Sequence, residues 1–271
     1  MNILRVQLEI FFNGSGSHLR REVRTVFTAL CLVSIAGGAY AQVDGAAWLK
    51  RIDDVERVPH SYAVIKQTIN TSTGGLRTFT MRSWTDEAGD VALIVYDAPA
   101  RVRGDKILQR DGGDNIWYYM ARQDVQRHFT GHARRQSAHG SDFSYEDLAQ
   151  GSMVDDYHVE SVKFEELDDE KCVRLRLVPV AGGPSYDHLL LWACIDDTLT
   201  RRIEYYDKEG LLKTLYITDF KVIEGRKTAT RMEMKNQRAS SRTVMEFISI
   251  TFAKKPPAWI FTKEALLRDI E

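Results

Sequence analysis

The stretch CVRLRLVPVAGGPSYDHLLLWAC, residues 172–194, contains the pattern that decides the fold. In its first half, Val173 and the two leucines that follow alternate with arginines, which is typical of a strand with one buried face and one face in water. The residues AGGPS at 181–185 are a turn signal, and a second apolar run follows them. The two runs therefore predict an antiparallel hairpin centred on Gly183.

Similar segments recur along the rest of the chain. Short runs rich in β-branched and aromatic residues follow one another at a spacing of roughly ten residues, with turn residues between most of them. The runs lie at 61–70, 76–85, 91–97, 105–111, 115–122, 158–165, 172–180, 188–195, 201–207, 211–223, 226–235 and 242–252. We predict a mainly β protein with few helices, built on one large antiparallel sheet of about eleven strands, which is curved because so broad a sheet rarely stays flat.

Two short helical segments are predicted to cover the apolar face of this sheet, one at 43–57 and a helical turn near 145–150. The apolar side chains that recur at helical spacing in the first segment are Trp48, Leu49, Ile52 and Val55. No repeat and no proline-rich linker divides the sequence, so residues 42–271 are predicted to form a single domain.

The composition excludes several classes of protein. The chain has 37 Lys+Arg against 38 Asp+Glu, and this balance gives no reason to expect a nucleic-acid partner. Hydrophobic residues make up 44% of the chain, which is ordinary for a globular protein. No apolar run reaches the roughly 18 residues of a transmembrane helix, so a polytopic membrane protein is excluded.

The N-terminal region has the three parts of an export signal. Arginines at 20, 21 and 24 precede an apolar run, and Ala39-Tyr40-Ala41 has the small-x-small pattern of a cleavage site. The alternative is a buried N-terminal helix. We predict that residues 1–41 are an N-terminal extension and signal peptide, that cleavage follows Ala41, and that the mature protein is periplasmic.

The hairpin register places Cys172 directly opposite Cys194, and Arg174 directly opposite Trp192. Opposed residues on antiparallel strands can bring their Cβ atoms to disulfide distance, and an exported protein meets an oxidising space. The alternative is a pair of buried free thiols. We predict a disulfide between Cys172 and Cys194, and a possible cation–π contact between Arg174 and Trp192.

Several stretches together resemble a known family. They are PARVRGDKIL at 99–108, NIWYYM at 115–120, GSDFSYEDL at 140–148, IEYYDKEG at 203–210 and FTKEAL at 261–266. These stretches resemble the outer-membrane lipoprotein-sorting (LolA-like) family of periplasmic proteins. The run GSDFSYEDL is the most specific of them.

This resemblance implies an incomplete, unclosed β-barrel with helices covering its concave face and a cavity that binds acyl chains. It implies a non-enzymatic carrier of a lipid or of the acyl chains of a lipoprotein, for transport to or sorting at the outer membrane. The wider branch of the family is linked to envelope transporters of the resistance-nodulation-division type. The alternative is therefore an accessory subunit that docks on such a transporter and carries nothing.

Candidate cavity residues are apolar and aromatic side chains on the predicted helix, on the central strands and beside the family motif. They are Trp48, Ile52, Phe79, Met81, Trp84, Trp117, Tyr118, Phe143, Leu175 and Leu177. The alternation of a strand does not decide which of Trp117 and Tyr118 points inward. Acyl chains need only apolar surface, so the prediction involves no cofactor.

The polar connection before the family motif offers basic and histidine side chains. Arg127, Arg134 and Arg135 are candidates for transient contact with an anionic head group or a membrane surface, because arginine binds phosphate in a bidentate way. The alternative is an ordinary charged surface. The histidines of this stretch are His128, His132 and His139. The first two have the spacing of a helical zinc pair but lack a glutamate base, and we predict no metal site.

The serines of the family motif are better explained by structure than by catalysis. Ser141 and Ser144 are not framed by the G-x-S-x-G motif of a nucleophile elbow. Ser144 with Asp147 three residues later matches a capping box, and Asp142 is expected to cap or to pair with Arg134 or Arg135. We therefore predict no catalytic residue.

Overall fold

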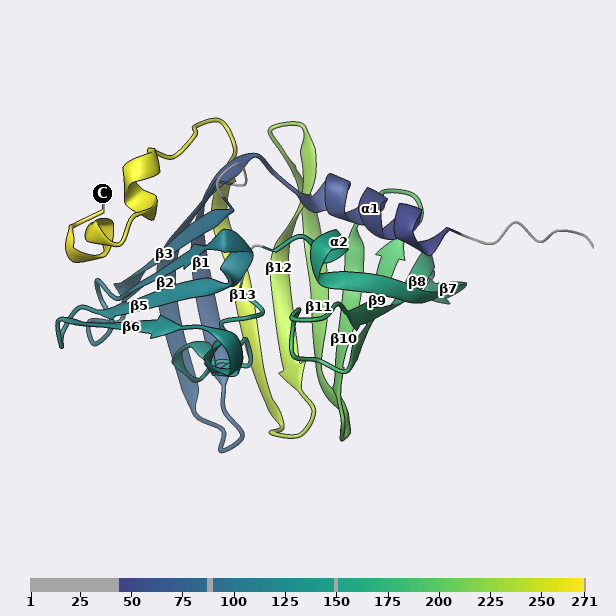
Figure 1. The fold of residues 1–271 in the computed structure, drawn as a ribbon, viewed down its shortest axis with the longest axis horizontal. Helices are drawn as coiled ribbons and strands as arrows, with labels where there is room; N and C mark the ends of the chain where they lie inside the picture. Colours follow the sequence, from purple (N-terminus) through teal and green to yellow (C-terminus); the bar gives the residue numbers. More distant parts are fainter. Residues whose placement is uncertain (1–43, 87–89, 149–150, 271) are drawn as a thin grey trace, which may run out of the picture. The chain divides into compact units, whose positions relative to one another are not determined.

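A computed structural model describes residues 44–86, 90–148 and 151–270. The predicted signal peptide and its cleavage site lie outside these residues. From Asp44 onward the described residues belong to one compact unit, and Figure 1 shows its strands side by side in one broad, curved sheet. None of the described helices is both long and apolar enough to cross a membrane.

The mainly β fold with a single antiparallel sheet is confirmed, and the sheet is not closed. Thirteen strands pair in the order β6-β5-β4-β3-β2-β1-β13-β12-β11-β10-β9-β8-β7. Their bounds are β1 His60–Asn70, β2 Leu76–Asp86, β3 Val91–Ala98, β4 Lys106–Arg110, β5 Asn115–Met120, β6 Val125–Phe129, β7 Tyr157–Leu167, β8 Glu170–Pro179, β9 His188–Cys194, β10 Thr200–Asp207, β11 Gly210–Ile223, β12 Arg226–Asn236 and β13 Ser241–Thr251. The sequence runs missed β6, because this edge strand is polar and exposes every residue except Phe129.

Shifts of register interrupt several of the strand pairs, and one of them changes which side chains of a central strand face the concave side. The pairing of β1 with β13 skips Ile248, so β13 carries a bulge at this residue. A bulge adds one residue to one strand, so the alternation of side chains between the two faces of the sheet is shifted by one position beyond the bulge. In β13 the concave side is therefore reached by Met245 and Phe247 before the bulge and by Ile250 after it.

Helix α1, Gly45–Glu56, is confirmed close to its predicted bounds. Asp44 caps it by accepting a hydrogen bond from the Ala47 amide at 3.0 Å. Leu49 and Ile52 are buried in the cluster on the concave side of the sheet. The helix is held at its C-terminal end by Arg226 of β12, which donates to the carbonyl oxygens of Val55 and Arg57.

The helical turn predicted near 145–150 corresponds to a turn at 145–148, which is closed by a hydrogen bond from the Leu148 amide to the Ser144 carbonyl at 3.3 Å. The short helix α2 follows at Met153–Asp156. Asp53 of α1 positions it, because the Asp53 carboxylate accepts hydrogen bonds from the Met153 amide at 3.0 Å and the Ser152 hydroxyl at 3.1 Å.

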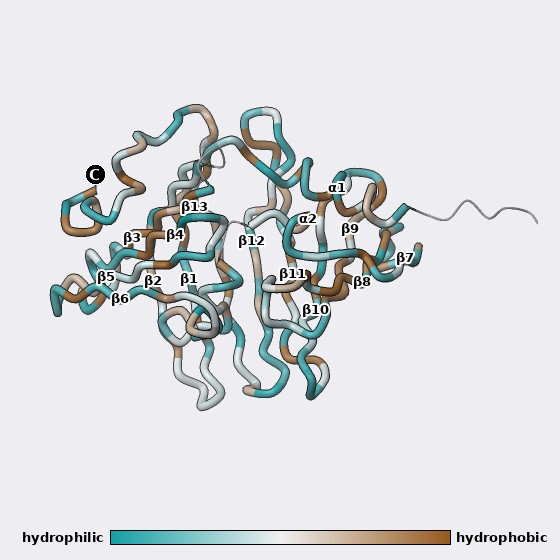
Figure 2. Tube along the Cα trace, viewed as in Figure 1, coloured by the Kyte–Doolittle hydropathy of each residue, from teal (hydrophilic) through white to brown (hydrophobic). Residues whose placement is uncertain are grey.

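The sheet carries a buried cluster on each of its two faces. The larger cluster lies on the concave face. The second lies on the opposite face of β2–β5, under the C-terminal segment with its short helical turns η5, Ala258–Phe261, and η6, Glu264–Leu267. Figure 1 shows this segment beside β3. Strand β3 has both faces covered, which explains its unbroken run of apolar residues, seen as brown in Figure 2.

The hairpin register predicted for β8 and β9 is confirmed. Cys172 pairs with Cys194 and Arg174 with Trp192, and the Arg174 guanidinium lies 5.7 Å from the centre of the Trp192 ring. The predicted disulfide is not present: both cysteines are buried free thiols, and their sulfurs are not at disulfide distance. Opposed backbones are necessary for a disulfide but do not fix the side-chain rotamers that bring the two sulfurs together.

We expect both thiols to react slowly in the folded protein. Burial, followed by the neighbouring Cys194 thiol, raises the pKa of Cys172 to about 11, so that only about one molecule in a thousand carries the reactive thiolate at pH 8. Treatment with iodoacetamide at pH 8, followed by peptide mapping, should show Cys172 and Cys194 unmodified in the native protein and both modified in urea. Fast labelling of native Cys172 would contradict this buried environment.

Candidate functional site

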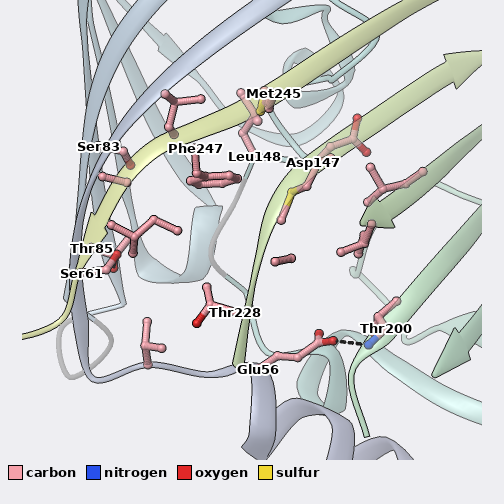
Figure 3. Close-up of a pocket in the computed structure, with 18 of the residues that line it drawn as sticks. Glu56, Ser61, Ser83, Thr85, Asp147, Leu148, Thr200, Thr228, Met245 and Phe247 are labelled. Atoms are coloured by element: carbon pink, nitrogen blue, oxygen red, sulfur yellow. Dashed lines mark hydrogen bonds between the residues drawn. The ribbon is translucent and has the colours of Figure 1, made fainter. Parts of the chain in front are cut away.

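The concave side of the sheet encloses a cavity of about 460 Å³. Its walls come from β1–β3 on one side and β10–β13 on the other, and α1 and the family motif lie at its two ends (Figure 3). Its apolar lining consists of Val55, Val58, Ala63, Ile65, Met81, Ile94, Phe143, Leu148, Met153, Leu199, Ile203, Leu215, Ile217, Phe220, Ala229, Met232, Met245, Phe247, Ile250 and Phe252. A cavity of this size and polarity is within the usual range for small-molecule sites.

The predicted cavity residues divide into three groups. Met81 and Phe143 line the cavity. The residues buried in the concave cluster, or packed against it, without lining the cavity are Trp48, Ile52, Phe79, Tyr118, Leu175 and Leu177. Trp84 and Trp117 lie in the second cluster, on the opposite face of the sheet.

Strand alternation explains the position of the two tryptophans. On β2 the cavity is lined by Met81, Ser83 and Thr85, so Trp84 between them points the other way. On β5, Tyr118 packs against the concave cluster and Trp117 stacks on His128, with ring centres 4.5 Å apart. The sequence did not separate the two faces, because the C-terminal segment makes the outer face of these strands apolar as well.

The family motif closes the deep end of the cavity. We call residues 140–148 the plug. Asp142 accepts hydrogen bonds from the hydroxyls of Ser241 and Thr243 on β13. Phe143 beside it reaches the cavity wall. The expected pairing of Asp142 with Arg134 or Arg135 is wrong, because the plug crosses the end of β13 and meets hydroxyls more than ninety residues away in sequence.

Asp147 holds the other end of the plug. It forms an ion pair with Lys213 of β11, and both side chains are almost fully buried. It also accepts hydrogen bonds from the Tyr186 hydroxyl and, at 2.6 Å, from the amide of Ser144. Ser144 in turn accepts from the Asp147 amide at 3.1 Å, so the reciprocal bonds of the predicted capping box are present.

The other end of the cavity, which we call the mouth, carries polar side chains. The hydroxyls of Ser61 and Thr85 are 2.8 Å apart, and in the view of Figure 3 Thr228 lies between this pair and Glu56. Glu56, at the end of α1, accepts a hydrogen bond from the Thr200 amide at 2.6 Å. Loss of water around its carboxylate raises the pKa of Glu56 above its usual value.

The basic candidates of the polar connection have different surroundings. Arg127 on β6 and Arg135 are exposed. Arg134 is only 12% exposed, because its guanidinium donates to the Asp114 carboxylate at 2.8 Å and to the Gly113 carbonyl at 3.0 Å. Arg134 is thus part of the internal hydrogen bonding of the fold.

His128 and His139 are also engaged within the fold. His128 lies 2.9 Å from the side-chain oxygen of Asn115. His139 packs among Phe79, Tyr96 and Tyr118, and burial lowers its pKa. Across residues 44–86, 90–148 and 151–270, no group of three or more His, Cys, Asp or Glu side chains is arranged to hold a metal ion.

A smaller acidic cleft of about 270 Å³ lies beside Arg134 and includes Asp114, Asp155 and Asp156. Burial, and next the nearby Asp114 carboxylate, raise the pKa of Asp156 to about 6. A carboxyl with a raised folded-state pKa binds more protons when folded, so its effect on stability becomes less favourable as the pH rises from about 4 to about 6.

Asp156→Asn should therefore stabilise the protein above pH 6 and leave it unchanged near pH 4. The side chain is only partly buried, and screening by water reduces the expected gain to about 1 kcal/mol at pH 7.5. Urea unfolding at the two pH values measures this gain. Asp169→Asn, in the exposed turn after β7, is the control and should show no such pH dependence; an equal effect of both variants would refute the assignment.

A family model described as "Uncharacterized protein" matches residues 89–268, more than half of the chain. Three solved structures share the fold: a DUF1329 family protein from Desulfovibrio piger, a "putative outer membrane lipoprotein-sorting protein domain" from Vibrio parahaemolyticus, and a LolA superfamily protein from Nitrosomonas europaea. The chain belongs to the family of this model and has the LolA-like fold.

The three solved structures are matched over almost their whole length. The Desulfovibrio protein is 27% identical, with a TM-score of 0.76 over 82% of this chain and 97% of its own. The Vibrio domain is 23% identical, with a TM-score of 0.77 over 83% and 98%. The Nitrosomonas protein is 21% identical, with a TM-score of 0.68 over 81% and 97%. No curated protein matches the chain.

The cavity residues that sequence reasoning missed come mainly from the second half of this LolA-like sheet. Leu215, Ile217, Met232, Met245 and Phe247 all line the cavity. Strand β13 carries the bulge at Ile248, and the pairing of β10 with β11 shifts its register between Tyr205 and Tyr206. Such shifts break the simple alternation from which an inward face is read, and they have no clear signal in the sequence.

Proposed function

We propose that the protein is a periplasmic, non-enzymatic carrier that binds a lipid, or the acyl chains of a lipoprotein, in the concave cavity. The observation that carries this proposal is the apolar cavity of about 460 Å³. Burial of an acyl chain contributes about 0.8 kcal/mol for each CH₂ group, so that binding needs no catalytic group and no cofactor. The lipoprotein-sorting and LolA names of two similar structures support a cargo of this class.

The proposed entrance is the mouth beside the C-terminal end of α1. The plug is fixed by a buried ion pair, whereas the end of α1 is held by Arg226 through two carbonyl oxygens at the surface. Movement of α1 breaks fewer buried polar contacts than movement of the plug. An incoming chain would replace the apolar contacts that Val55 and Val58 make at the cavity wall.

The exposed arginines complete the proposal. Arg127 and Arg135 can make transient contacts with anionic head groups at a membrane surface during loading or release. These contacts would weaken with salt, because exposed charges are screened. Arg134 has no place in this surface, since Asp114 pairs with it. The proposed destination of the cargo is the outer membrane.

The alternative, an accessory subunit docked on an envelope transporter, has less support. That function needs a contact patch but no ligand space, and a cavity filled by the protein's own side chains would suit it. The open cavity favours the carrier.

Mass spectrometry of lipids extracted from protein purified without detergent tests the carrier function. We expect an acyl-containing compound at near-stoichiometric amount, or tight binding of a fluorescent fatty-acid probe by delipidated protein. Protein that is empty and also fails to bind the probe would exclude the proposal. Cross-linking in the intact envelope would then test the docking alternative.

A further inference from the structure

The apolar wall of the cavity contains one buried amide, that of Gln67. Gln67 lies on β1 and pairs with Phe79 of β2 and Met245 of β13. Its side chain lines the cavity and the residue is 1% exposed. Among the described residues, its carbonyl oxygen Oε1 has no hydrogen-bond partner.

A buried polar atom without a partner destabilises a protein, so its presence in a cavity wall needs a reason. Leucine or methionine would fill the same position on the strand without this cost. The other polar side chain deep in the cavity, Asp147, is paired with Lys213 and Tyr186. The oxygen of Gln67 thus has an unmet hydrogen bond in the cavity wall, and a change of side-chain rotamer would present it to a molecule that occupies the cavity.

The depth of Gln67 defines which part of a ligand can reach it. Ser61 is at the mouth, and Gln67 is six residues farther along the same strand, roughly 20 Å away at the rise of a β-strand. At the mouth, Thr200 is engaged with Glu56, whose carboxylate interacts with both the amide and the side chain of Thr200. A chain with a polar group at the end that enters first would satisfy Gln67.

We infer that the cavity selects a chain-like amphiphile with a hydroxyl group at the end that enters first, and that Gln67 is the hydrogen-bond partner of this hydroxyl. The inference rests on the proposed carrier function. An amide offers a donor and an acceptor, and a hydroxyl can serve either one whichever way the amide is turned. A charged group at this depth would lack a counter-ion, since the buried Lys213 is already paired.

Competition against a fluorescent acyl probe tests this selectivity. The ligands are hexadecanoic acid, its ω-hydroxy analogue and its α-hydroxy analogue, and the proteins are the wild type, Gln67→Leu and Thr200→Val. The wild type should bind the ω-hydroxy acid about fivefold more tightly than the other two, as expected for one added hydrogen bond to a buried group. Gln67→Leu should lose this preference, and Thr200→Val should affect all three ligands to the same extent.

The possible outcomes distinguish a failure of the role assigned to Gln67 from a failure of the proposed carrier function. Failure of all three acids to bind the wild type would refute the carrier function. Equal binding of the three would refute the role of Gln67 and leave the carrier intact. Gln67→Leu should also raise the melting temperature of the ligand-free protein, since it removes the unpartnered amide; a variant that melts lower or keeps the ω-hydroxy preference would overturn the inference.

Discussion

Lys213→Met should lower the free energy of unfolding by about 3 kcal/mol, the largest single effect on stability that we expect from a change at the plug. Lys213 and Asp147 are almost completely buried, and methionine leaves the Asp147 carboxylate without its cation. The Lys213 ammonium also lies over the rings of Tyr186 and Tyr205, at 5.4 and 5.3 Å. Urea unfolding followed by circular dichroism measures the loss.

Lys235→Met is the matched control, because Lys235 is a half-exposed lysine on the neighbouring strand β12, with a pair to Glu233 at 3.7 Å and a ring contact with Tyr216 at 4.6 Å. Its effect should stay within about 0.5 kcal/mol. The double variant with Asp147→Asn should recover part of the loss, since the unpaired charge is then removed. Equal effects of the two lysine variants would mean that the plug is not held by this ion pair.

Phe247→Asp should reduce the affinity for an acyl probe by at least about tenfold, whereas Ile248→Asp should leave it within about twofold. Phe247 lines the cavity, and a carboxylate there places an unpaired charge against the bound chain. Ile248 is 64% exposed, because it is the residue that the bulge in β13 leaves out of the pairing.

These two variants differ by one position and test the bulge as well as the cavity. Probe titration gives the affinities, and thermal unfolding shows whether each protein is folded. If both substitutions weaken binding equally, or only Ile248→Asp does so, the inward face of β13 is assigned incorrectly and the probe binds elsewhere.

The sequence predicted those parts of the fold that depend on neighbouring residues. The hairpin of β8 and β9 could be read to the residue, because its alternation and its turn lie within 23 residues of one another. Helix α1 was predicted for the same reason. Strand β6 was missed because its polar, exposed residues do not show the alternation of a half-buried strand.

The candidate site was predicted less completely, because its contacts join distant parts of the chain. Asp142 accepts a hydrogen bond from Thr243, which is 101 residues away in the sequence. No local sequence pattern predicts such a distant partner. Trp84 and Trp117 are aromatic side chains of the kind expected in a cavity wall, but they lie under the C-terminal segment on the other face of the sheet. Alternation assigns residues to two faces and does not say which face is concave.

The order of the strands divides the sheet into two consecutive meanders, β1–β6 and β7–β13, which meet at one seam between β1 and β13. Each meander is made of hairpins between adjacent segments. The seam instead joins residues as far apart as Tyr62 and Thr251, and it can form only when nearly the whole chain is present. The cavity spans this seam, with Ile65 and Met81 on one side and Leu215 and Met245 on the other. A bound acyl chain would therefore contact both meanders and couple them. The unfolding of an occupied carrier should then be more cooperative than the unfolding of an empty one.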